Sequence, residues 1–181
     1  MKPNNTVTPK LLRQAQAGNL AAFEMMVKAY EQPIYSYIYR LAGRREDAED
    51  LTQETFVKLY RNLSRYDPSK KFSTWLYTIA THTVYDAWRA KKHHKELLIL
   101  DDPDRRIETI DPRSSYEVIR RRVDIQKALT QLPPPYRNIL LLYYYRGFRY
   151  AEIAEILQMP LNTVKTDLRR AKLALQQLLN G

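Results

Sequence analysis

The polar residues most suited to a chemical role lie near the C-terminus, in a segment whose pattern predicts a helix-turn-helix. A short helix over residues 150–157 is followed by a turn at residues 158–160 and a longer helix to about residue 179. In the second helix an apolar stripe repeats at helical spacing: Val164, Leu168, Ala171, Leu175 and Leu178. The residues left outside this stripe suit phosphates and base edges: Asn162, Thr163, Lys165, Thr166, Arg169, Arg170 and Lys172. DNA binding is the favoured interpretation, and a solvated basic face on an ordinary bundle helix is the alternative.

A second basic segment, residues 61–95, combines cations with aromatic side chains. It carries eight Lys and Arg residues against Asp67 and Asp86, a net charge of +6. Because unpaired bases stack on aromatic rings while cations hold phosphates, such a segment suits single-stranded or melted nucleic acid. A long helix is predicted from a cap at Ser73 to about Lys95, and its nucleic-acid side is expected to carry Thr78, Thr81, His82, Tyr85, Arg89 and Lys92. The alternative is that the aromatic residues anchor the core, which is favoured for Trp88 and left open for Trp75.

A third segment has the opposite charge. Its acidic residues crowd the start of one predicted helix, with Gln53 among them: Glu46, Asp47, Glu49, Asp50 and Glu54. Carboxylates could bind a metal or act as an acid and base, but no histidine lies nearby or stands at the spacing of a metalloprotease helix. A docking surface for a basic protein partner is therefore favoured. The alternative is a solvated helix N-terminus, which the helix dipole stabilises.

Composition excludes several other kinds of site. The 181 residues contain no cysteine, which excludes a disulfide scaffold, a thiolate zinc site and a cysteine nucleophile. The four glycines stand alone and form no phosphate-binding loop. No apolar run approaches the roughly 20 residues that span a bilayer, and the first ten residues lack the apolar core of a signal peptide. We expect a soluble intracellular protein whose charge of +10 serves a polyanionic partner, the alternative being that the charge serves solubility alone.

The elements that must position these segments are predicted to be helices throughout. No segment alternates with period two, so the fold class expected is all-α. Thr8 and Asn19 are expected to cap the first two helices, and Pro33 to kink or break the second. Residues 96–117 carry seven acidic and three basic residues, with Pro103 and Pro112 among them, and indicate a linker. Two small helical domains, residues 1–95 and 116–181, are therefore expected on either side of an acidic flexible linker over residues 96–115.

Taken together, these segments resemble a bacterial RNA polymerase sigma factor of the extracytoplasmic-function group of the sigma-70 family. The resemblance covers residues 11–179. The stretches that carry it are 47–56 (DAEDLTQETF), 72–77 (FSTWLY) with Ile79, Ala80 and Asp86, 132–134 (LPP) with Tyr136 and Arg137, Tyr150 with 152–157 (EIAEIL), and Pro160 with 163–165 (TVK). Each is a modest signal, and their order and spacing together are specific.

The resemblance implies roles for particular residues. Core-polymerase docking on the β′ clamp helices falls on Asp47, Asp50, Gln53 and Glu54. Opening and reading of the minus-ten promoter element falls on Lys70, Lys71, Phe72, Trp75, Tyr77, His82, Tyr85, Arg89 and Lys92. Reading of the minus-thirty-five element falls on Asn162, Thr163, Lys165, Thr166, Arg169 and Arg170. The acidic linker falls where the family threads through polymerase channels that otherwise hold nucleic acid.

The resemblance also implies partners and excludes others. Core polymerase, through its β′ clamp helices and β flap, and promoter DNA are the partners expected, with an anti-sigma factor that can be anchored in the membrane. The protein would act in the bacterial cytoplasm, or at the inner face of the membrane where its inhibitor holds it. No cofactor, metal, small-molecule substrate or covalent catalysis is implied. A stand-alone helix-turn-helix regulator is the main alternative, and an enzyme using the acidic helix is a remote one.

This chain departs from the family pattern at a few positions. His82 stands where Asn is common, and Thr78 and Thr81 where Arg is frequent. Arg149 occupies a position usually held by a capping Ser or Thr. Gln158, Asn162 and Asp167 are further departures, at and after the turn of the helix-turn-helix. The promoter sequences are therefore not carried over from the family.

Overall fold

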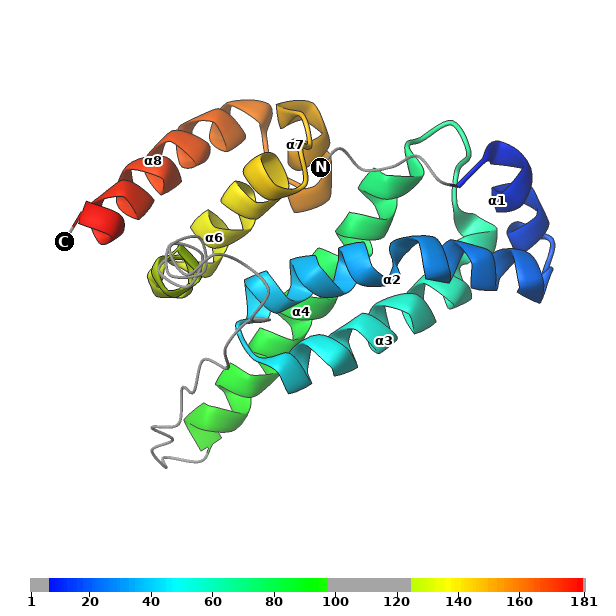
Figure 1. The fold of residues 1–181 in the computed structure, drawn as a ribbon, viewed down its shortest axis with the longest axis horizontal. Helices are drawn as coiled ribbons and strands as arrows, with labels where there is room; N and C mark the ends of the chain where they lie inside the picture. Colours follow the sequence, from blue (N-terminus) through cyan, green and yellow to red (C-terminus); the bar gives the residue numbers. More distant parts are fainter. Residues whose placement is uncertain (1–6, 98–124, 181) are drawn as a thin grey trace, which may run out of the picture.

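In the computed structural model, described over residues 7–97 and 125–180, the chain is all-α, as predicted. Each half of the chain folds into a small group of helices (Figure 1). The N-terminal half contains α1 (Pro9–Gln16), α2 (Leu20–Ala42), α3 (Arg45–Asn62), the 3-10 turn η1 (Leu63–Arg65) and α4 (Phe72–Leu97). The C-terminal half contains a helical stretch over residues 125–131, α6 (Pro134–Leu140), the π-helical turn η2 (Leu141–Tyr145), α7 (Tyr150–Leu157) and α8 (Leu161–Asn180). The expected acidic linker lies mostly outside the described residues.

The helix ends in the N-terminal half follow from local side-chain chemistry. Thr8 caps α1 through a hydrogen bond from the Leu11 amide, and Asn19 caps α2 through one from the Ala22 amide, as predicted. At the other end of α2, Gly43 adopts φ of +84°, a left-handed conformation that glycine adopts without strain. These caps set the lengths of the two helices and the turns that join them to their neighbours.

Two local predictions need correction. Of the kink or break expected at Pro33, the break is absent, because helix α2 runs from Leu20 to Ala42 with the proline inside it. The turns on either side of Pro33 bury Tyr30, Ile34 and Tyr37, so tertiary packing outweighs the hydrogen bond that proline removes. Helix α4 begins at Phe72, so Ser73 lies inside its first turn and does not cap it. The Ser73 side chain is buried, and within the described residues its hydroxyl makes no hydrogen bond.

The core of the N-terminal half lies between α2, α3 and α4. Met26, Ile34 and Ile38 of α2, Leu59 of α3 and Leu76 of α4 are fully buried there. Helix α1 lies against the start of α2, at the right-hand end of the molecule in Figure 1. The remaining face of α3 stays at the surface and carries acidic residues singled out in the sequence, whereas α4 is also in contact with α7 of the C-terminal half.

In the C-terminal half the predicted elements appear within a residue or two of their expected ends. The three prolines 133–135 separate the helical stretch 125–131 from α6, because Pro133 precedes the helix and Pro134 begins it. Helix α6 continues into η2, and Gly147 turns the chain with φ of +74° before α7. At the turn to α8, Gln158 is the one residue other than glycine in the described part of the chain with positive φ, +52°.

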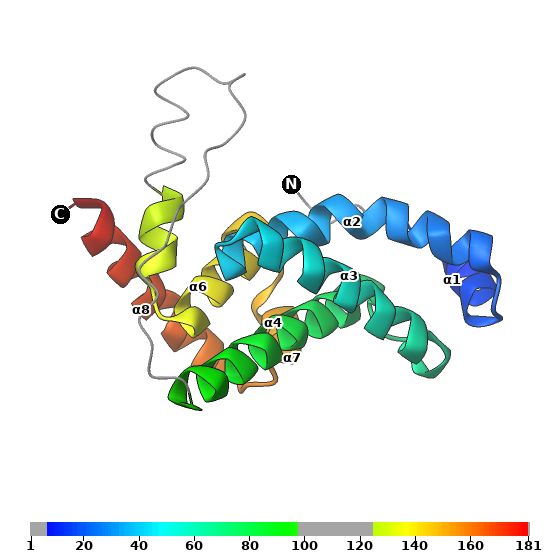
Figure 2. The same cartoon turned by 90° about the horizontal axis from the view of Figure 1, so that it is seen from below.

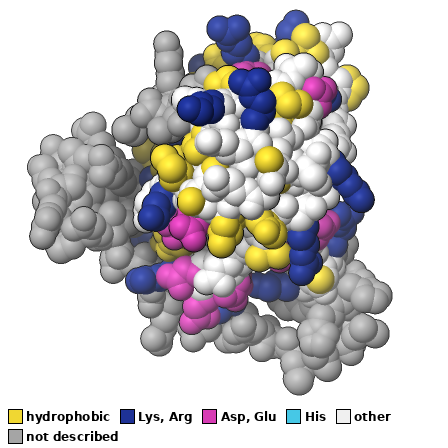
Figure 3. Space-filling view, turned by 90° about the vertical axis from the view of Figure 1, so that its right-hand side faces the viewer, with side chains coloured by type: hydrophobic (Ala, Val, Ile, Leu, Met, Phe, Trp, Pro, Cys, Tyr) yellow, Lys and Arg dark blue, Asp and Glu magenta, His cyan; other side chains and the backbone are white. Residues whose placement is uncertain are grey.

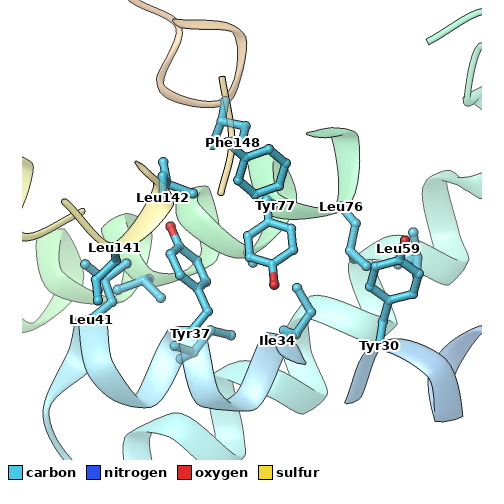
Figure 4. Close-up of a cluster of buried hydrophobic side chains, with 14 of the residues drawn as sticks. Tyr30, Ile34, Tyr37, Leu41, Leu59, Leu76, Tyr77, Leu141, Leu142 and Phe148 are labelled. Atoms are coloured by element: carbon cyan, nitrogen blue, oxygen red, sulfur yellow. The ribbon is translucent and has the colours of Figure 1, made fainter. Parts of the chain in front are cut away.

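The two halves pack directly on each other. Helix α7 lies against α4, and α6 with η2 lies against α2, so that the C-terminal half covers one side of the N-terminal bundle (Figures 1 and 2). Figure 4 shows Tyr77 of α4 between Ile34 of α2 and Phe148 of the C-terminal half. Leu141 and Leu142 of η2 lie beside Leu41 and Tyr37 of α2 in the same cluster. Within the described residues, no helix combines the length and apolar character that crossing a membrane requires.

Candidate nucleic-acid interface

The acidic residues of α3 form an exposed stripe on the face opposite its core contacts. Asp50, Gln53 and Glu54 are all exposed, while Leu51 and Phe56 of the same helix are buried. The spacing i, i+3, i+4 places the three polar side chains together on one side. Asp47 differs, because both of its carboxylate oxygens accept from Lys91 Nζ of α4 at 2.7 Å. The stripe available to a partner in this structure is therefore Asp50, Gln53 and Glu54.

This stripe carries no arrangement suited to a metal. Glu54 forms an ion pair of 2.8 Å with Lys58, one turn along the helix, and Lys58 also lies 3.6 Å from Asp86 of α4. Among the described residues no three His, Asp or Glu side chains are close enough to share a metal ion. The acidic residues are thus paired with cations or exposed, and the surface is suited to a protein partner.

Exposed hydrophobic side chains lie beside these charges. Tyr60 and Val57 of α3 are about half exposed, at 55% and 47%, and the Tyr60 ring contacts Phe23 of α2 edge-on at 5.0 Å. Figure 3 views the molecule from the right-hand side of Figure 1, and on this face hydrophobic side chains are interspersed with Lys and Arg while acidic side chains gather in the lower part of the view.

The loop before α4 keeps its shape through its own polar groups. Tyr66 donates from its hydroxyl to the Lys70 carbonyl, and Asp67 Oδ1 accepts from the Ser69 amide at 2.9 Å. The hydrogen bonds from Ser69 lower the pKa of Asp67. Lys70 and Lys71 are both exposed on this loop, and the Lys71 ammonium is paired with Glu152 of α7.

The first two turns of α4 do not present their aromatic residues to solvent as expected. Phe72 is buried between the rings of Tyr30 and Tyr66, with centroids 5.5 and 5.6 Å away. Tyr77 is fully buried, and burial raises its pKa well above the usual range. The expectation that these two side chains lie on a nucleic-acid surface is wrong for this conformation, because Phe72 packs within the N-terminal half and Tyr77 packs against both halves. Trp75 is neither a fully buried core anchor nor fully exposed to nucleic acid: it is half-buried, and its ring centroid lies 4.7 Å from that of Tyr66.

Further along α4 the predicted polar side is only partly exposed. Thr81 was expected outside, yet it is fully buried and lies 2.7 Å from the Tyr37 hydroxyl. His82 and Tyr85 are half-buried, and Arg89 is exposed and paired with Asp86. The side chain of Lys92 lies outside the described residues. His82, Tyr85 and Arg89 thus stay on one side of the helix, while Thr81 belongs to the core.

A groove runs beside this part of α4. It has a volume of about 530 Å³ and is lined by residues of both halves: His82, Tyr85, Asp86, Trp88, Arg89, Pro134, Pro135 and Gln158. The rings of Tyr85 and Trp88 stack with centroids 5.4 Å apart, so the groove has an aromatic wall with a guanidinium at its edge. The alternative in which Trp88 is a core anchor is half right, because Trp88 packs against the core and also lines the groove.

The last two helices have the geometry of a helix-turn-helix. Val164, Leu168 and Ala171 are buried against α6 and α7, as predicted, and the apolar stripe is less buried toward its end, where Leu178 is exposed. All six residues expected to contact DNA are exposed: Asn162, Thr163, Lys165, Thr166, Arg169 and Arg170. Asp167 lies 3.9 Å from Arg170 and is the one acidic side chain of α8. These six positions therefore give α8 three exposed cations and three exposed short polar side chains, and Lys172, also exposed, adds a fourth cation.

Contacts between the halves involve residues that we did not single out in the sequence as functional. Asn138 of α6 is fully buried, accepts from the Tyr37 hydroxyl at 2.6 Å and donates to the Tyr85 hydroxyl at 2.9 Å. Lys71 forms an ion pair of 2.6 Å with Glu152 of α7. Arg146 lies over the Tyr77 ring at 5.0 Å. Periodicity could not reveal these residues, because their partners lie 53 to 101 positions away along the chain.

Comparison with known proteins groups the chain with one family along most of its length. Residues 26–94 match the family described as Sigma-70 region 2, and residues 122–175 match the one described as Sigma-70, region 4. The chain is 33% identical to the ECF RNA polymerase sigma factor SigW of Bacillus subtilis over 178 residues, which cover 94% of this chain and 95% of that one. It is 32% identical to the RNA polymerase sigma factor YlaC of the same organism, covering 86% of this chain and 91% of that one.

Two solved structures share the fold. The sigma factor RpoE of Bartonella quintana, in complex with the anti-sigma factor NepR, superposes with a TM-score of 0.76 at 23% identity, covering 87% of this chain and 96% of that one. CnrH, in complex with the cytosolic domain of CnrY, superposes with a TM-score of 0.70 at 23% identity, covering 94% and 96%.

Proposed function

The chain belongs to the sigma-70 family of bacterial RNA polymerase sigma factors, in its extracytoplasmic-function group, and from this premise we propose how its surfaces divide the work. The α3 stripe docks on core polymerase, the exposed part of α4 with its preceding loop engages the minus-ten element, and α8 reads the minus-thirty-five element in the major groove. The mechanism is recruitment and strand opening. It uses no cofactor, metal, small-molecule substrate or covalent catalysis.

The observation that carries most weight is the exposed face of α8. A recognition helix needs one buried stripe and an opposite face of Arg, Lys, Asn and Thr, and α8 has both. Arg169 and Arg170 suit guanine edges or phosphates, while Asn162 at the start of the helix suits an adenine edge. A stand-alone regulator would have the same helix, but it would not account for the match to region 2 over residues 26–94.

The α3 stripe supports the polymerase contact. Asp50, Gln53 and Glu54 offer acceptors on a rigid helix, and Val57 and Tyr60 extend the same side of α3 with apolar surface. Acidic acceptors beside apolar side chains suit a basic helical partner, and the β′ clamp helices fit that description. The C-terminal half would contact the β flap.

The reconstitution that tests this function mixes the purified protein with bacterial core polymerase and a library of promoter fragments. We expect transcription from promoters that core polymerase alone ignores. Tight binding to duplex DNA without core polymerase, and no promoter-specific transcription with it, would favour the stand-alone regulator.

Substitutions assign the two surfaces separately. Asp50→Ala with Gln53→Ala should abolish core binding without changing the fold, and Glu31→Ala with Gln32→Ala, an exposed pair on α2, is the matched control. Arg169→Ala and Arg170→Ala should weaken promoters with a strong upstream element by roughly 1–3 kcal/mol per lost base contact. Unchanged core affinity in the first pair, or unchanged upstream preference in the second, would contradict the respective assignment.

We also propose an anti-sigma partner and a cytoplasmic location. One solved relative above was captured with the anti-sigma factor NepR, and the other with the cytosolic domain of CnrY. An inhibitor anchored in the membrane would hold this protein at the inner face. Fractionation of cells that express the protein with and without its chromosomal neighbours tests this, because a membrane-held fraction should require the inhibitor.

A further inference from the structure

The polar residues of α8 fall on two edges of the helix that differ in charge. Residues at i, i+4 and i+7 lie on one side of a helix. At this spacing the first edge carries three exposed cations: Lys165, Arg169 and Lys172. The second edge carries a hydroxyl, a carboxylate and a guanidinium: Thr163, Asp167 and Arg170. The first edge therefore has a charge of +3, whereas the charges of the second edge cancel.

On the second edge Asp167 is placed to hold the Arg170 guanidinium. Its Oδ1 lies 3.9 Å from Arg170 Nη1, one turn further along the helix. The Asp167 side chain is 23% exposed against 61% for Arg170, so the carboxylate lies closer to the buried stripe and the guanidinium reaches outward. Within the described residues, the three cations of the first edge have no carboxylate partner. The two edges thus differ in whether their cations are held in place.

Neither fold stability nor attraction to DNA explains a carboxylate at this position. An ion pair between exposed side chains adds little to stability. Asp167 stands in the second turn of α8, beyond the first turn where the helix dipole favours an anion. On a surface that binds DNA, a carboxylate is repelled by the phosphates that supply most of the sequence-independent affinity. The role of Asp167 must therefore lie in how Arg170 meets the DNA.

Pairing with a carboxylate changes what an arginine can do in the major groove. A free guanidinium is attracted to any phosphate within reach, and such a contact carries no sequence information. A carboxylate partner offsets this attraction, because it cancels the charge of the guanidinium. It also leaves most of the five N–H donors available, and two of them suffice for O6 and N7 of a guanine. The pair therefore favours contact with a base over contact with a phosphate.

We propose that Asp167 determines specificity by positioning Arg170 on a guanine edge of the minus-thirty-five element and by keeping it off the phosphates. The cations of the first edge hold the phosphate backbone instead. Asp167 acts through Arg170 and is a positioning residue. The inference rests on the proposed function, because the partner of α8 is promoter DNA.

Base preference in the holoenzyme tests the positioning. Core polymerase reconstituted with the unmodified chain is offered promoter fragments whose upstream element is randomised, and the bound fragments are sequenced. We expect a preference for guanine at one position, of which Asp167→Ala should lose roughly five- to tenfold. Asp167→Glu keeps a carboxylate within reach of Arg170 and should retain most of the preference. An unchanged guanine preference in Asp167→Ala would overturn the proposal.

Salt dependence distinguishes positioning from simple repulsion. Once released by Asp167→Ala, Arg170 should gain a phosphate contact, which steepens the slope of log affinity against log salt concentration by roughly 0.9. Glu155→Ala is the matched control, because it removes an exposed carboxylate from α7 and changes the net charge equally. We expect the control to keep both the base preference and the slope. If Asp167→Ala binds every sequence more tightly with the same base preference, Asp167 only repels phosphates and the proposal is wrong.

A double substitution shows whether Asp167 acts through Arg170. In an Arg170→Ala background, Asp167→Ala should cause no further change in base preference. A second change at another base would mean that Asp167 contacts that base itself, which would overturn the positioning role.

The unmodified holoenzyme separates this inference from the function on which it rests. If it prefers particular bases upstream and Asp167→Ala keeps that preference, only the inference fails. If it shows no upstream base preference, the assignment of α8 to the minus-thirty-five element fails, and the inference fails with it.

Discussion

At the scale of single residues, Arg137 shows how one side chain can hold two halves of a chain together. Its guanidinium donates to three carbonyls at the end of the helical stretch 125–131, those of Leu129, Thr130 and Leu132, and to the Leu41 carbonyl of α2 at 2.7 Å. These carbonyls lie at or just beyond helix ends, where the helix itself supplies few donors, and the Leu129 carbonyl also accepts from the Leu132 amide at 3.2 Å. A planar group with five donors can satisfy all four at once, and no other side chain can.

Arg137→Lys should therefore destabilise the protein strongly although the charge is kept. An ammonium cannot reach all four carbonyls, and each buried acceptor left unpaired costs about 1–3 kcal/mol, so we expect a loss of about 2–4 kcal/mol in the free energy of unfolding. Urea denaturation followed by circular dichroism measures it. Arg13→Lys, at an exposed position on α1, is the control and should change the value by less than about 0.5 kcal/mol. A loss below about 1 kcal/mol at Arg137 would show that the four carbonyls do not depend on it.

Buried tyrosines should give the protein a steep loss of stability at high pH. Burial raises the pKa of Tyr37 well above its usual value of 10.0, and raises that of Tyr85 in the same way. Between the ordinary and the raised pKa the unfolded chain has released protons that the folded chain keeps. Stability is therefore complete below pH 10 and falls as the pH rises through the raised values.

Ultraviolet titration of the 14 tyrosines checks this. We expect an early class and a late class that ionises together with unfolding, and Tyr37→Phe should remove one tyrosine from the late class. If Tyr37→Phe reduces the early class instead, the assignment of Tyr37 to the buried network is wrong.

Sequence patterns identified exposed residues of this chain better than buried ones. The six α8 positions expected at the surface lie there, because an amphipathic period assigns each residue of a two-sided helix to one side. Phe72, Tyr77 and Thr81 of α4 were expected on a nucleic-acid surface and are buried. Helix α4 is covered on two sides, once by α2 and α3 and once by the C-terminal half, and the second covering comes from residues distant in sequence.

At the scale of elements, both ends of α7 are unusual: its last turn leads into a residue with strained backbone, and its first turn has an atypical cap. Gln158 adopts φ of +52° and ψ of +46°, and the Met159 amide donates to the Ala154 carbonyl across it. At the other end of α7, Arg149 precedes the first turn and cannot accept a hydrogen bond from it, so the Glu152 carboxylate accepts from the Arg149 amide instead. Burial would raise the pKa of Glu152, but hydrogen bonds from Lys71 and the Arg149 amide together lower it.

Gln158→Gly should stabilise the protein. Glycine adopts the left-handed conformation without the clash of a Cβ atom, a gain of roughly 1 kcal/mol that the greater freedom of glycine in the unfolded chain partly offsets. We expect a net gain of about 0.5 kcal/mol in the free energy of unfolding, measured by urea denaturation. The matched control has the opposite sign: Gln176→Gly, at an exposed position inside α8, should cost about 1 kcal/mol. If both substitutions destabilise the protein, the Gln158 side chain contributes more to the free energy of unfolding than the strain of its left-handed backbone takes away.

Element boundaries were predictable where a cap or a proline run marks them. Thr8 and Asn19 stand at the helix ends that they predict, and Gly43 and the prolines 133–135 also stand at helix ends. The failures at Pro33 and Ser73 have a common physical reason. Both residues carry a local preference for a helix end, and both lie in segments whose neighbours are buried, so that tertiary packing outweighs the local preference.

At the scale of the whole molecule, the two halves share one hydrophobic core. Leu41 and Tyr77 of the N-terminal half lie in the same cluster as Leu142 and Phe148 of the C-terminal half (Figure 4). The resemblance of the sequence to a two-domain family predicted the all-α fold and its two helical parts, but not that they pack together. The sequence pattern of neither half predicts the contact, since the residues that make it also fit the helical periodicity of their own segments.

A shared core predicts that the halves unfold as one unit in the free protein, and both tryptophans lie in α4, so fluorescence can report on this. In a Trp88→Phe background the remaining Trp75, whose ring contacts Tyr66 within the N-terminal half, reports on that half. Ile153→Ala truncates a fully buried side chain of α7 and should cost about 2–5 kcal/mol. If the halves are coupled, this change in the C-terminal half lowers the urea midpoint of the Trp75 transition as much as it lowers the midpoint by circular dichroism.

Met26→Ala, in the core of the N-terminal half, is the positive control, because it must shift the Trp75 transition in either case. A Trp75 midpoint that Ile153→Ala leaves in place would show that the halves unfold independently. The contact between them would then contribute too little free energy to keep the C-terminal half on α4.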